Sequence, residues 1–185
     1  GDELCLAGCQ DAFDHTAPAL AHDPTRGEYL LLHARAESPE VTRMSGQRLT
    51  TDGIAIGAGF DLDAEPTERH APLRNEAALA FDAALGSYMA AWPAWGRDGA
   101  RMDLYFRLLA PPPGTSTPAR LIVHMAQDQT APAAAVGSAA GEYLLAWTDG
   151  RRLGASDVYA RPVAFDVTPP EARLSVQPSV ATVGA

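Results

Sequence analysis

Carboxylates that recur at fixed places are the first side chains of this sequence that could carry chemistry. Asp103 and Asp157 occupy matching places in two similar segments, which would suit a pair of acid–base carboxylates. A position that repeats in this way favours instead a structural hydrogen bond to a neighbouring strand or turn. The run Asp61-Leu62-Asp63-Ala64-Glu65 alternates carboxylates that could hold calcium, but it lacks the glycine and the full ligand set of a calcium-binding loop. We expect neither feature to be a catalytic or metal site.

Histidine, serine and glycine patterns give no catalytic constellation either. The histidines show no close metal-binding spacing such as His-x-His or His-x-x-x-His; they are His15, His22, His33, His70 and His124. The sequence has no Gly-x-Ser-x-Gly segment and no phosphate-binding glycine loop. We therefore predict no catalytic residue, no metal and no cofactor, and an enzyme is the less favoured hypothesis.

Aromatic residues offer the remaining candidates for binding. Trp95 stands outside the repeat described below, beside Gly96-Arg97-Asp98-Gly99, in an irregular stretch. Loops positioned by a rigid scaffold are where function concentrates, so Trp95, Arg97 and Asp98 are the predicted binding residues. A second group of rings could form a sugar-binding platform, but their fixed place in an apolar strand favours core packing; they are Tyr29, Tyr88, Tyr143, Trp92 and Trp147.

Composition and charge limit the classes of partner. The 185 residues are 46% hydrophobic and 20% charged, as in a globular protein, and the net charge of -9 disfavours nucleic-acid binding. No apolar run reaches the length of a membrane span. The two cysteines, Cys5 and Cys9, predict a small local disulfide, and hence an extracellular, periplasmic or cell-envelope location.

A threefold repeat must position all these residues. Its copies begin at Pro18, Ala77 and Pro132, and a tyrosine follows 11 residues later in each. A glycine-ended turn precedes each tyrosine, at Gly27, Gly86 and Gly141. An arginine follows the tyrosine after 19, 19 and 18 residues, at Arg48, Arg107 and Arg161, and we expect these arginines to pair with acidic groups at the rim.

Each copy is predicted to form four β-strands that become less buried along the chain. The turn glycine permits positive φ and closes a hairpin, and the strand after it is apolar on both faces, as in Leu30-Leu31-Leu32. The third strand partly alternates, as in Met102 to Arg107, and is expected nearer the rim. Repeated four-stranded units of this kind are typical of β-propeller blades.

The repeat resembles the blades of secreted bacterial β-propeller proteins. Those blades read approximately Glu-Tyr-Leu-Val-x-Trp-x-Asp-x-Arg, then Asp-Ile-Tyr-Gly-Gln-Arg and Asp-Gly. The chain matches them at Tyr143, Trp147, Asp149, Arg151 and Asp157-Val158-Tyr159, and at Gly46-Gln47-Arg48 and Thr51-Asp52-Gly53. It departs from them at His33, which stands where the pattern has tryptophan, and at a proline-rich insert from 111 to 114. The resemblance implies an all-β propeller fold and says little about activity.

The expected organisation is three blades and one further strand. The boundaries are an N-terminal segment 1–13, blades at 14–74, 75–127 and 128–176, and the first strand of another blade at 177–185. Three blades cannot close a ring that needs at least four, so something must cover the open edge: further blades of a longer chain, another subunit, or a second copy as a homodimer. The preferred function is a non-enzymatic, exported scaffold for protein–protein assembly. The alternative is a carbohydrate-binding or glycan-processing propeller enzyme.

Overall fold

The computed structural model describes residues 13–38, 41–62, 76–95, 101–110, 115–116, 119–152, 155–166 and 173–175, and this part of the chain is all-β. The fold-class prediction is confirmed at that level. The strands are β1 (Asp14–Asp23), β2 (Glu28–Ser38), β3 (Val41–Thr50), β4 (Ala55–Asp61), β5 (Ala78–Asp82), β6 (Ser87–Trp95), β7 (Met102–Ala110), β8 (Thr115–Ser116), β9 (Arg120–Val123), β10 (Gln129–Val136), β11 (Glu142–Asp149), β12 (Asp157–Asp166) and β13 (Arg173–Ser175). Within the described ranges, no helix has the length and hydropathy needed to cross a bilayer.

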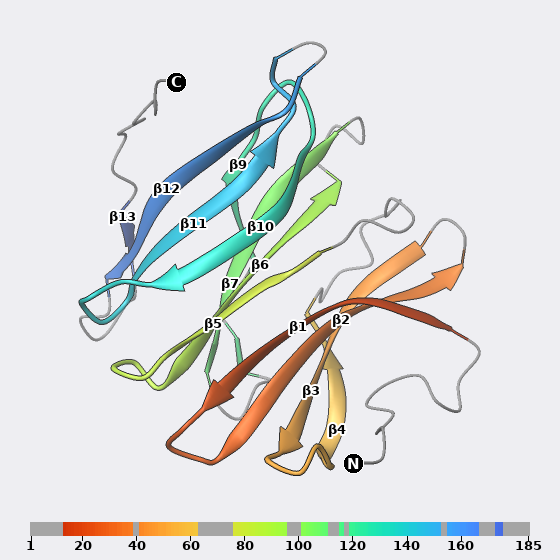
Figure 1. The fold of residues 1–185 in the computed structure, drawn as a ribbon, viewed down its shortest axis with the longest axis vertical. Coiled ribbons are helices and arrows are strands. Elements are labelled where there is room, and N and C mark those ends of the chain that lie inside the picture. The colour runs from red at the N-terminus through yellow and green to blue at the C-terminus, as the bar shows by residue number, and fades with distance from the viewer. Residues whose placement is uncertain are drawn as a thin grey trace.

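The strands form three antiparallel sheets in chain order (Figure 1). Sheet A is β1-β2-β3-β4, and sheet C is β10-β11-β12-β13. Sheet B is β5-β6-β7, and the outer side of β7 pairs with both β8 and β9. The first strands of the sheets lie side by side, β1 next to β5 and β5 next to β10, so the sheets share one inner edge (Figure 1).

The hairpins within the sheets show why the repeat spacing is kept. Gly27, Gly86 and Gly141 all have positive φ, between 61° and 79°. Each ends the turn that precedes the tyrosine of its repeat copy, as the sequence predicts. A second recurrence was not expected. Ala17 and Ala131 both adopt positive φ, 52° and 47°, at a bulge in β1 and in β10. The same unusual backbone therefore recurs in copies one and three.

Sheet B lies between the other two sheets and is buried on both faces. Along β6 the side chains alternate between two cores, so that Trp92 packs against sheet A and Met89 against sheet C. The A–B core contains Leu30, Leu32, Ala34, Met44, Leu62, Tyr88, Ala90, Trp92 and Leu109. The B–C core contains Ala78, Met89, Ala91, Leu104, Phe106, Leu108, Val123, Tyr143, Leu145, Trp147, Val163 and Phe165.

This middle position corrects the expectation for one strand. β7 was expected to lie near a polar rim, but it is buried along almost its whole length, because sheets A and C cover both of its faces. Its counterpart β12, in a terminal sheet, has the alternating pattern that the sequence predicts, with Val158, Ala160 and Pro162 exposed. The expected further strand at 177–185 and the predicted Cys5–Cys9 disulfide lie outside the described residues.

Candidate functional site

Asp61, Asp103 and Asp157, the described carboxylates among the metal and acid–base candidates, are each engaged in structural contacts. Asp61 accepts a hydrogen bond from the Ser45 hydroxyl at 2.8 Å, and the buried Asp103 carboxylate contacts His124 Nδ1 at 2.9 Å. On another part of the surface, the Asp157 carboxylate accepts a hydrogen bond from Arg152 Nη1 at 3.4 Å. Among the described residues no group of three histidines, cysteines or carboxylates could hold a metal ion; Asp63, Glu65 and His70 lie outside them.

The predicted binding residues are described only in part. Trp95 ends β6 opposite Met102 and is partly buried, and its indole Nε1 is buried without a hydrogen-bond partner in the described part of the chain. Arg97 and Asp98 lie outside the described residues. The structure therefore places Trp95 at the end of sheet B without bringing the three residues together.

The tyrosines and tryptophans of the repeat serve mainly as core residues. Tyr88, Trp92, Tyr143 and Trp147 expose between 1% and 5% of their surface, whereas Tyr29 is partly buried. A sugar cannot stack on rings that are covered by a neighbouring sheet. The core interpretation of these aromatic residues is thus confirmed for the four buried rings.

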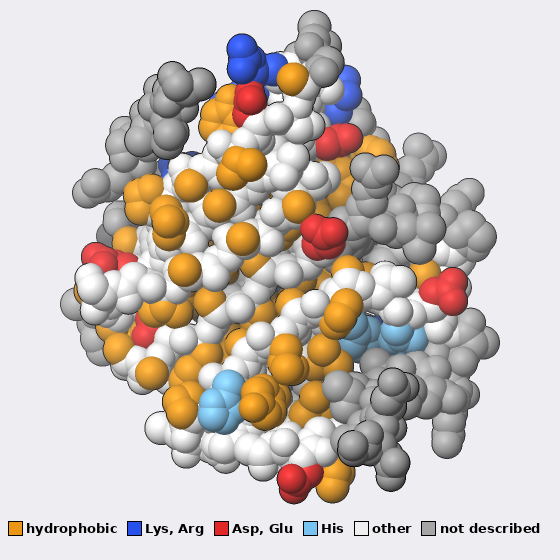
Figure 2. All heavy atoms as spheres, viewed as in Figure 1, with side chains coloured by type: hydrophobic (Ala, Val, Ile, Leu, Met, Phe, Trp, Pro, Cys, Tyr) orange, Lys and Arg blue, Asp and Glu red, His pale blue; other side chains and the backbone are white. Residues whose placement is uncertain are grey.

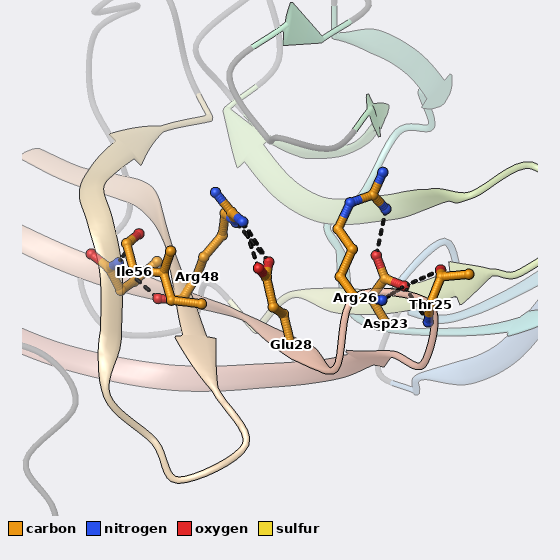
Figure 3. Close-up of polar contacts among 7 residues, drawn as sticks. Asp23, Thr25, Arg26, Glu28, Arg48 and Ile56 are labelled. Carbon is orange, nitrogen blue, oxygen red and sulfur yellow. Dashed lines mark hydrogen bonds and ion pairs between the residues drawn. The ribbon is translucent and has the colours of Figure 1, made fainter.

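The turns at the lower end of sheet A carry a dense set of polar contacts (Figure 3). Asp23 caps the β1–β2 turn by accepting hydrogen bonds from the backbone N–H groups of Thr25 and Arg26, from the Thr25 hydroxyl, and from Arg26 Nη1 at 2.7 Å. Burial opposes its charge, but these donors hold the pKa of Asp23 below its usual value. Beside it, Arg48 binds both oxygens of Glu28, at 2.6 to 2.9 Å (Figure 3).

Equivalent contacts join one sheet to the next. Asp82 caps the β5–β6 turn in the same way, through the N–H groups of Ala84 and Leu85, and its second oxygen accepts the backbone N–H of Gly141 in sheet C at 2.7 Å. The tyrosine of the next sheet interacts with each turn carboxylate, Tyr88 with Asp23 and Tyr143 with Asp82. Burial, followed by the charges of Asp23 and Glu28, raises the pKa of Tyr88 to about 12.

The repeated arginines divide into two structural kinds. Arg48 pairs with a carboxylate, as expected. Arg107 instead donates to the carbonyl of Leu62, directly after the last strand of sheet A, and Arg161 donates to the carbonyl of Ile122, in β9 of sheet B, at 3.4 Å. Two different causes explain the difference: β2 and β3 pair one residue out of step with β6 and β7, whereas Arg161 follows its tyrosine by 18 residues instead of 19. Arg48 lies opposite the first residue after its tyrosine, but Arg107 and Arg161 lie opposite the second, so they point to the other face of their sheets.

The face of sheet A that turns away from sheet B is called here the outer face of sheet A. It carries Leu20, His22, Tyr29, Leu31 and His33. Leu20 and His22 are exposed and Leu31 and His33 are buried, and His33 Nδ1 lies 3.1 Å from His15 Nδ1. Sequence reasoning noted His33 as a departure from tryptophan but did not predict this histidine pair.

An ion-pair network borders the outer face of sheet A. Glu37 accepts Arg35 Nη2 at 2.6 Å and Arg43 Nε at 2.8 Å, and Arg35 also approaches Asp61 at 3.5 Å. The hydrogen bonds from Arg43 and Arg35 keep the pKa of Glu37 below its usual value. A carboxylate held in this way is a poor proton acceptor at neutral pH, so the network supports structure rather than acid–base catalysis.

Sheet C contains the cluster that best matches the resemblance. Asp149 is fully buried and accepts Trp147 Nε1 at 3.1 Å and Arg151 Nη2 at 2.6 Å. The Arg151 guanidinium lies 3.9 Å from the ring centre of Tyr159, which stacks with Trp147. Burial opposes the charge of Asp149, but the donors from Arg151 and Trp147 lower its pKa. These residues hold β11 and β12 together at their upper end.

The face of sheet C that is turned away from sheet B, called here the free face of sheet C, is an open apolar surface. Its side chains are apolar across three strands: Ala133, Ala135, Leu144, Ala146, Val158, Ala160 and Pro162. Leu144 and Val158 expose 51% and 79% of their surface. Figure 2 shows hydrophobic side chains gathered over the region of β10 to β12. Contiguous apolar patches of this kind mark interaction surfaces in soluble proteins.

Comparisons with known proteins add no assignment. No protein-family model matches this sequence, and no match is found among curated proteins. The functional argument therefore depends on the surfaces described above.

Proposed function

We propose that this chain is a segment of an exported β-propeller scaffold, without enzymatic activity, that assembles with a protein surface covering the free face of sheet C. Three antiparallel sheets, two of four strands and one of five, share an inner edge, and contacts recur at both sheet junctions; these features support the propeller interpretation. The resemblance to secreted propeller blades supports a location outside the cytoplasm, at the cell envelope or beyond it.

One observation carries the proposal. The positions that form the free face of sheet C are covered in the other two copies: Leu144 and Ala146 correspond to Leu30 and Leu32 of sheet A, which are fully buried by sheet B. The equivalent residues in sheet B, Met89 and Ala91, are fully buried by sheet C. The repeat thus uses this face for packing, and in sheet C it has no cover among the described residues.

Light scattering of the purified chain, combined with binding of an apolar dye such as ANS, tests the proposal. We expect either self-association or strong dye binding, because an open apolar face must be covered or accessible. A dispersed monomer that binds no dye would contradict it. Robust hydrolysis of a glycan, tested over a broad panel, would replace the scaffold by an enzyme.

A further inference from the structure

We propose that His15 and His33, on the outer face of sheet A, form a binding site for a divalent late transition-metal ion, with Cu²⁺ bound most strongly. The two imidazoles are its protein ligands, and water completes its coordination. The site lies on another sheet than the proposed scaffold surface and takes another kind of partner, so it goes beyond the proposed function.

The bulge in β1 brings His15 to the same face as His33. His15 and Leu20 are five positions apart, yet their partners on β2 show that both belong to the outer face of sheet A. In a regular strand, residues an odd number of positions apart point to opposite faces. The register shifts after Thr16, where Ala17 adopts a φ of 52°, and the extra residue turns His15 outward.

The two rings have the spacing of a chelating pair. His15 Nδ1 lies 3.1 Å from His33 Nδ1, and the ring centres are 4.8 Å apart. A metal about 2.0–2.1 Å from both nitrogens, on the axes of the two rings, would place the ring centres about 4.8 Å apart at this nitrogen separation. A straight hydrogen bond between the same nitrogens would place them about 5.4 Å apart. The observed separation matches the chelating arrangement.

Imidazole ligands select the class of metal. Imidazole nitrogen suits zinc, copper and nickel ions, whereas Ca²⁺ and Mg²⁺ prefer oxygen ligands. Among the divalent first-row ions, Cu²⁺ binds a given set of nitrogen ligands most strongly, and its tetragonal coordination accepts two neighbouring imidazoles. Within the described ranges, no third histidine, cysteine or carboxylate completes a metal-binding group with the pair. The expected complex is therefore a Cu²⁺ ion held by two imidazoles and by solvent.

The charged side chains described beside the pair do not repel a cation as a group. Arg35, which lies opposite His15, donates to Glu37 at 2.6 Å and approaches Asp61 at 3.5 Å. Arg43 donates to the same Glu37 at 2.8 Å. The guanidinium groups are thus balanced by carboxylates, and the chain as a whole has a net charge of -9. A cation meets a locally neutral surface on an acidic molecule.

The repeat shows that the histidine pair is particular to the first copy. Gln129 and Trp147 hold the places of His15 and His33 in the third copy, where β10 has the same bulge as β1. The second copy has Trp92 at the place of His33 and an arginine at that of His15. The repeat thus provides the backbone that brings the two positions together, and the first copy alone has imidazoles at both.

Isothermal titration calorimetry of the full 185-residue chain with Cu²⁺ tests the site. His15→Gln introduces the residue of the third copy, and His33→Gln removes the other ligand. We expect each variant to lower the affinity of the strongest Cu²⁺ site by about a hundredfold, because an ion held by two linked groups binds far more tightly than to either one. His22→Gln, at an exposed histidine of the same face, should leave the affinity unchanged. Alkylation of any free thiol in every sample excludes binding to cysteine.

Two further measurements identify the ligands. An ion that binds only the folded chain raises its melting temperature. Excess Cu²⁺ should therefore raise the melting temperature of the wild type and of His22→Gln, but not that of His15→Gln. Electron paramagnetic resonance of the bound Cu²⁺ should show coupling to two imidazole nitrogens in the wild type and lose it in His15→Gln. Excess Ca²⁺ should leave the melting temperature of the wild type unchanged.

Equal Cu²⁺ affinity of the wild type and His15→Gln would overturn the inference and assign the 3.1 Å contact to a hydrogen bond alone. A loss of affinity in His22→Gln but not in His15→Gln would do the same. Circular dichroism without metal checks that the variants fold. Should the buried His33 not tolerate replacement, the partly buried His15 carries the test by itself. Neither result depends on whether the free face of sheet C binds a protein.

Discussion

The carboxylate of Asp82, in the β5–β6 turn, accepts a hydrogen bond from the backbone N–H of Gly141, 59 residues further along the chain, at 2.7 Å. The same carboxylate caps its own turn through its other oxygen. One side chain therefore sets the shape of a turn in sheet B and fixes the position of sheet C against it.

Replacing Asp82 should weaken both contacts together. Asp82→Ala is expected to lower the free energy of unfolding by about 2–3 kcal/mol, because it leaves buried N–H donors without a charged acceptor. Asp82→Asn should recover only part of this loss, since an amide has one acceptor oxygen where the carboxylate uses two. Urea unfolding measures both, with Asp52→Asn, in an exposed turn, as the control. Equal stability of Asp82→Ala and the wild type would contradict the contact.

Trp147 should be among the most costly residues to remove. It exposes 5% of its surface in the B–C core and donates its indole N–H to Asp149. Trp147→Ala is expected to cost about 3–5 kcal/mol through the cavity that it leaves. A loss below about 1 kcal/mol would show that the residue does not lie between packed sheets. Thermal and urea unfolding of the variant provide the measurement.

Replacing Ala131 by glycine should stabilise the folded chain. Its φ of 47° lies in the left-handed region, which is unfavourable for a residue with a Cβ atom. Ala131→Gly is therefore expected to raise the free energy of unfolding by up to about 1 kcal/mol. Ala133→Gly, two residues along the same strand, should lower it by about 0.5–1 kcal/mol, because glycine there loses more chain entropy. The opposite signs of the two changes are the observable; a loss in both variants would argue against a left-handed Ala131.

Tyr88 should make stability fall at alkaline pH. Its pKa is raised to about 12 in the folded chain, against about 10 in an unfolded one, so between these values the unfolded state loses its proton first. The free energy of unfolding should then decrease with a contribution of about 1.4 kcal/mol per pH unit from this residue. Tyr88→Phe should remove that contribution, which unfolding curves at pH 10 to 12 would reveal. Measurements at pH 7 separate it from the loss of the hydroxyl itself.

The sequence predicted most of the described strands and the three hairpin turns because their signals are local. The positive φ of Gly27, Gly86 and Gly141 and the burial of Tyr143 and Trp147 follow from spacing and residue type. The repeat spacing did not predict the different contacts of the arginines, because these depend on how the strands pair. Arg48 has the same offset as Arg107 in sequence, but β2 and β3 pair one residue out of step with β6 and β7, which turns it to the other face.

The candidate surface could not be predicted in the same way. Leu144 and Leu30 occupy equivalent places in similar strands, yet one is exposed and the other is buried, because sheet B covers Leu30 and no described residue covers Leu144 in that way. Which copy is terminal is a property of the packing order, not of the local residues. Trp95 was selected by its place outside the repeat, whereas the open face consists mainly of alanines, with Leu144, Val158 and Pro162, and such residues carry no functional signal in a sequence.

The contacts between sheets also bear on how such a chain changes over time. Gly141 is held through its backbone N–H, and Leu62 and Ile122 receive arginines through their carbonyls. A main-chain group is the same whatever the side chain, so half of each contact survives substitution. A repeat unit can therefore vary in sequence at positions such as Leu62 and Ile122 without losing these contacts to its neighbour.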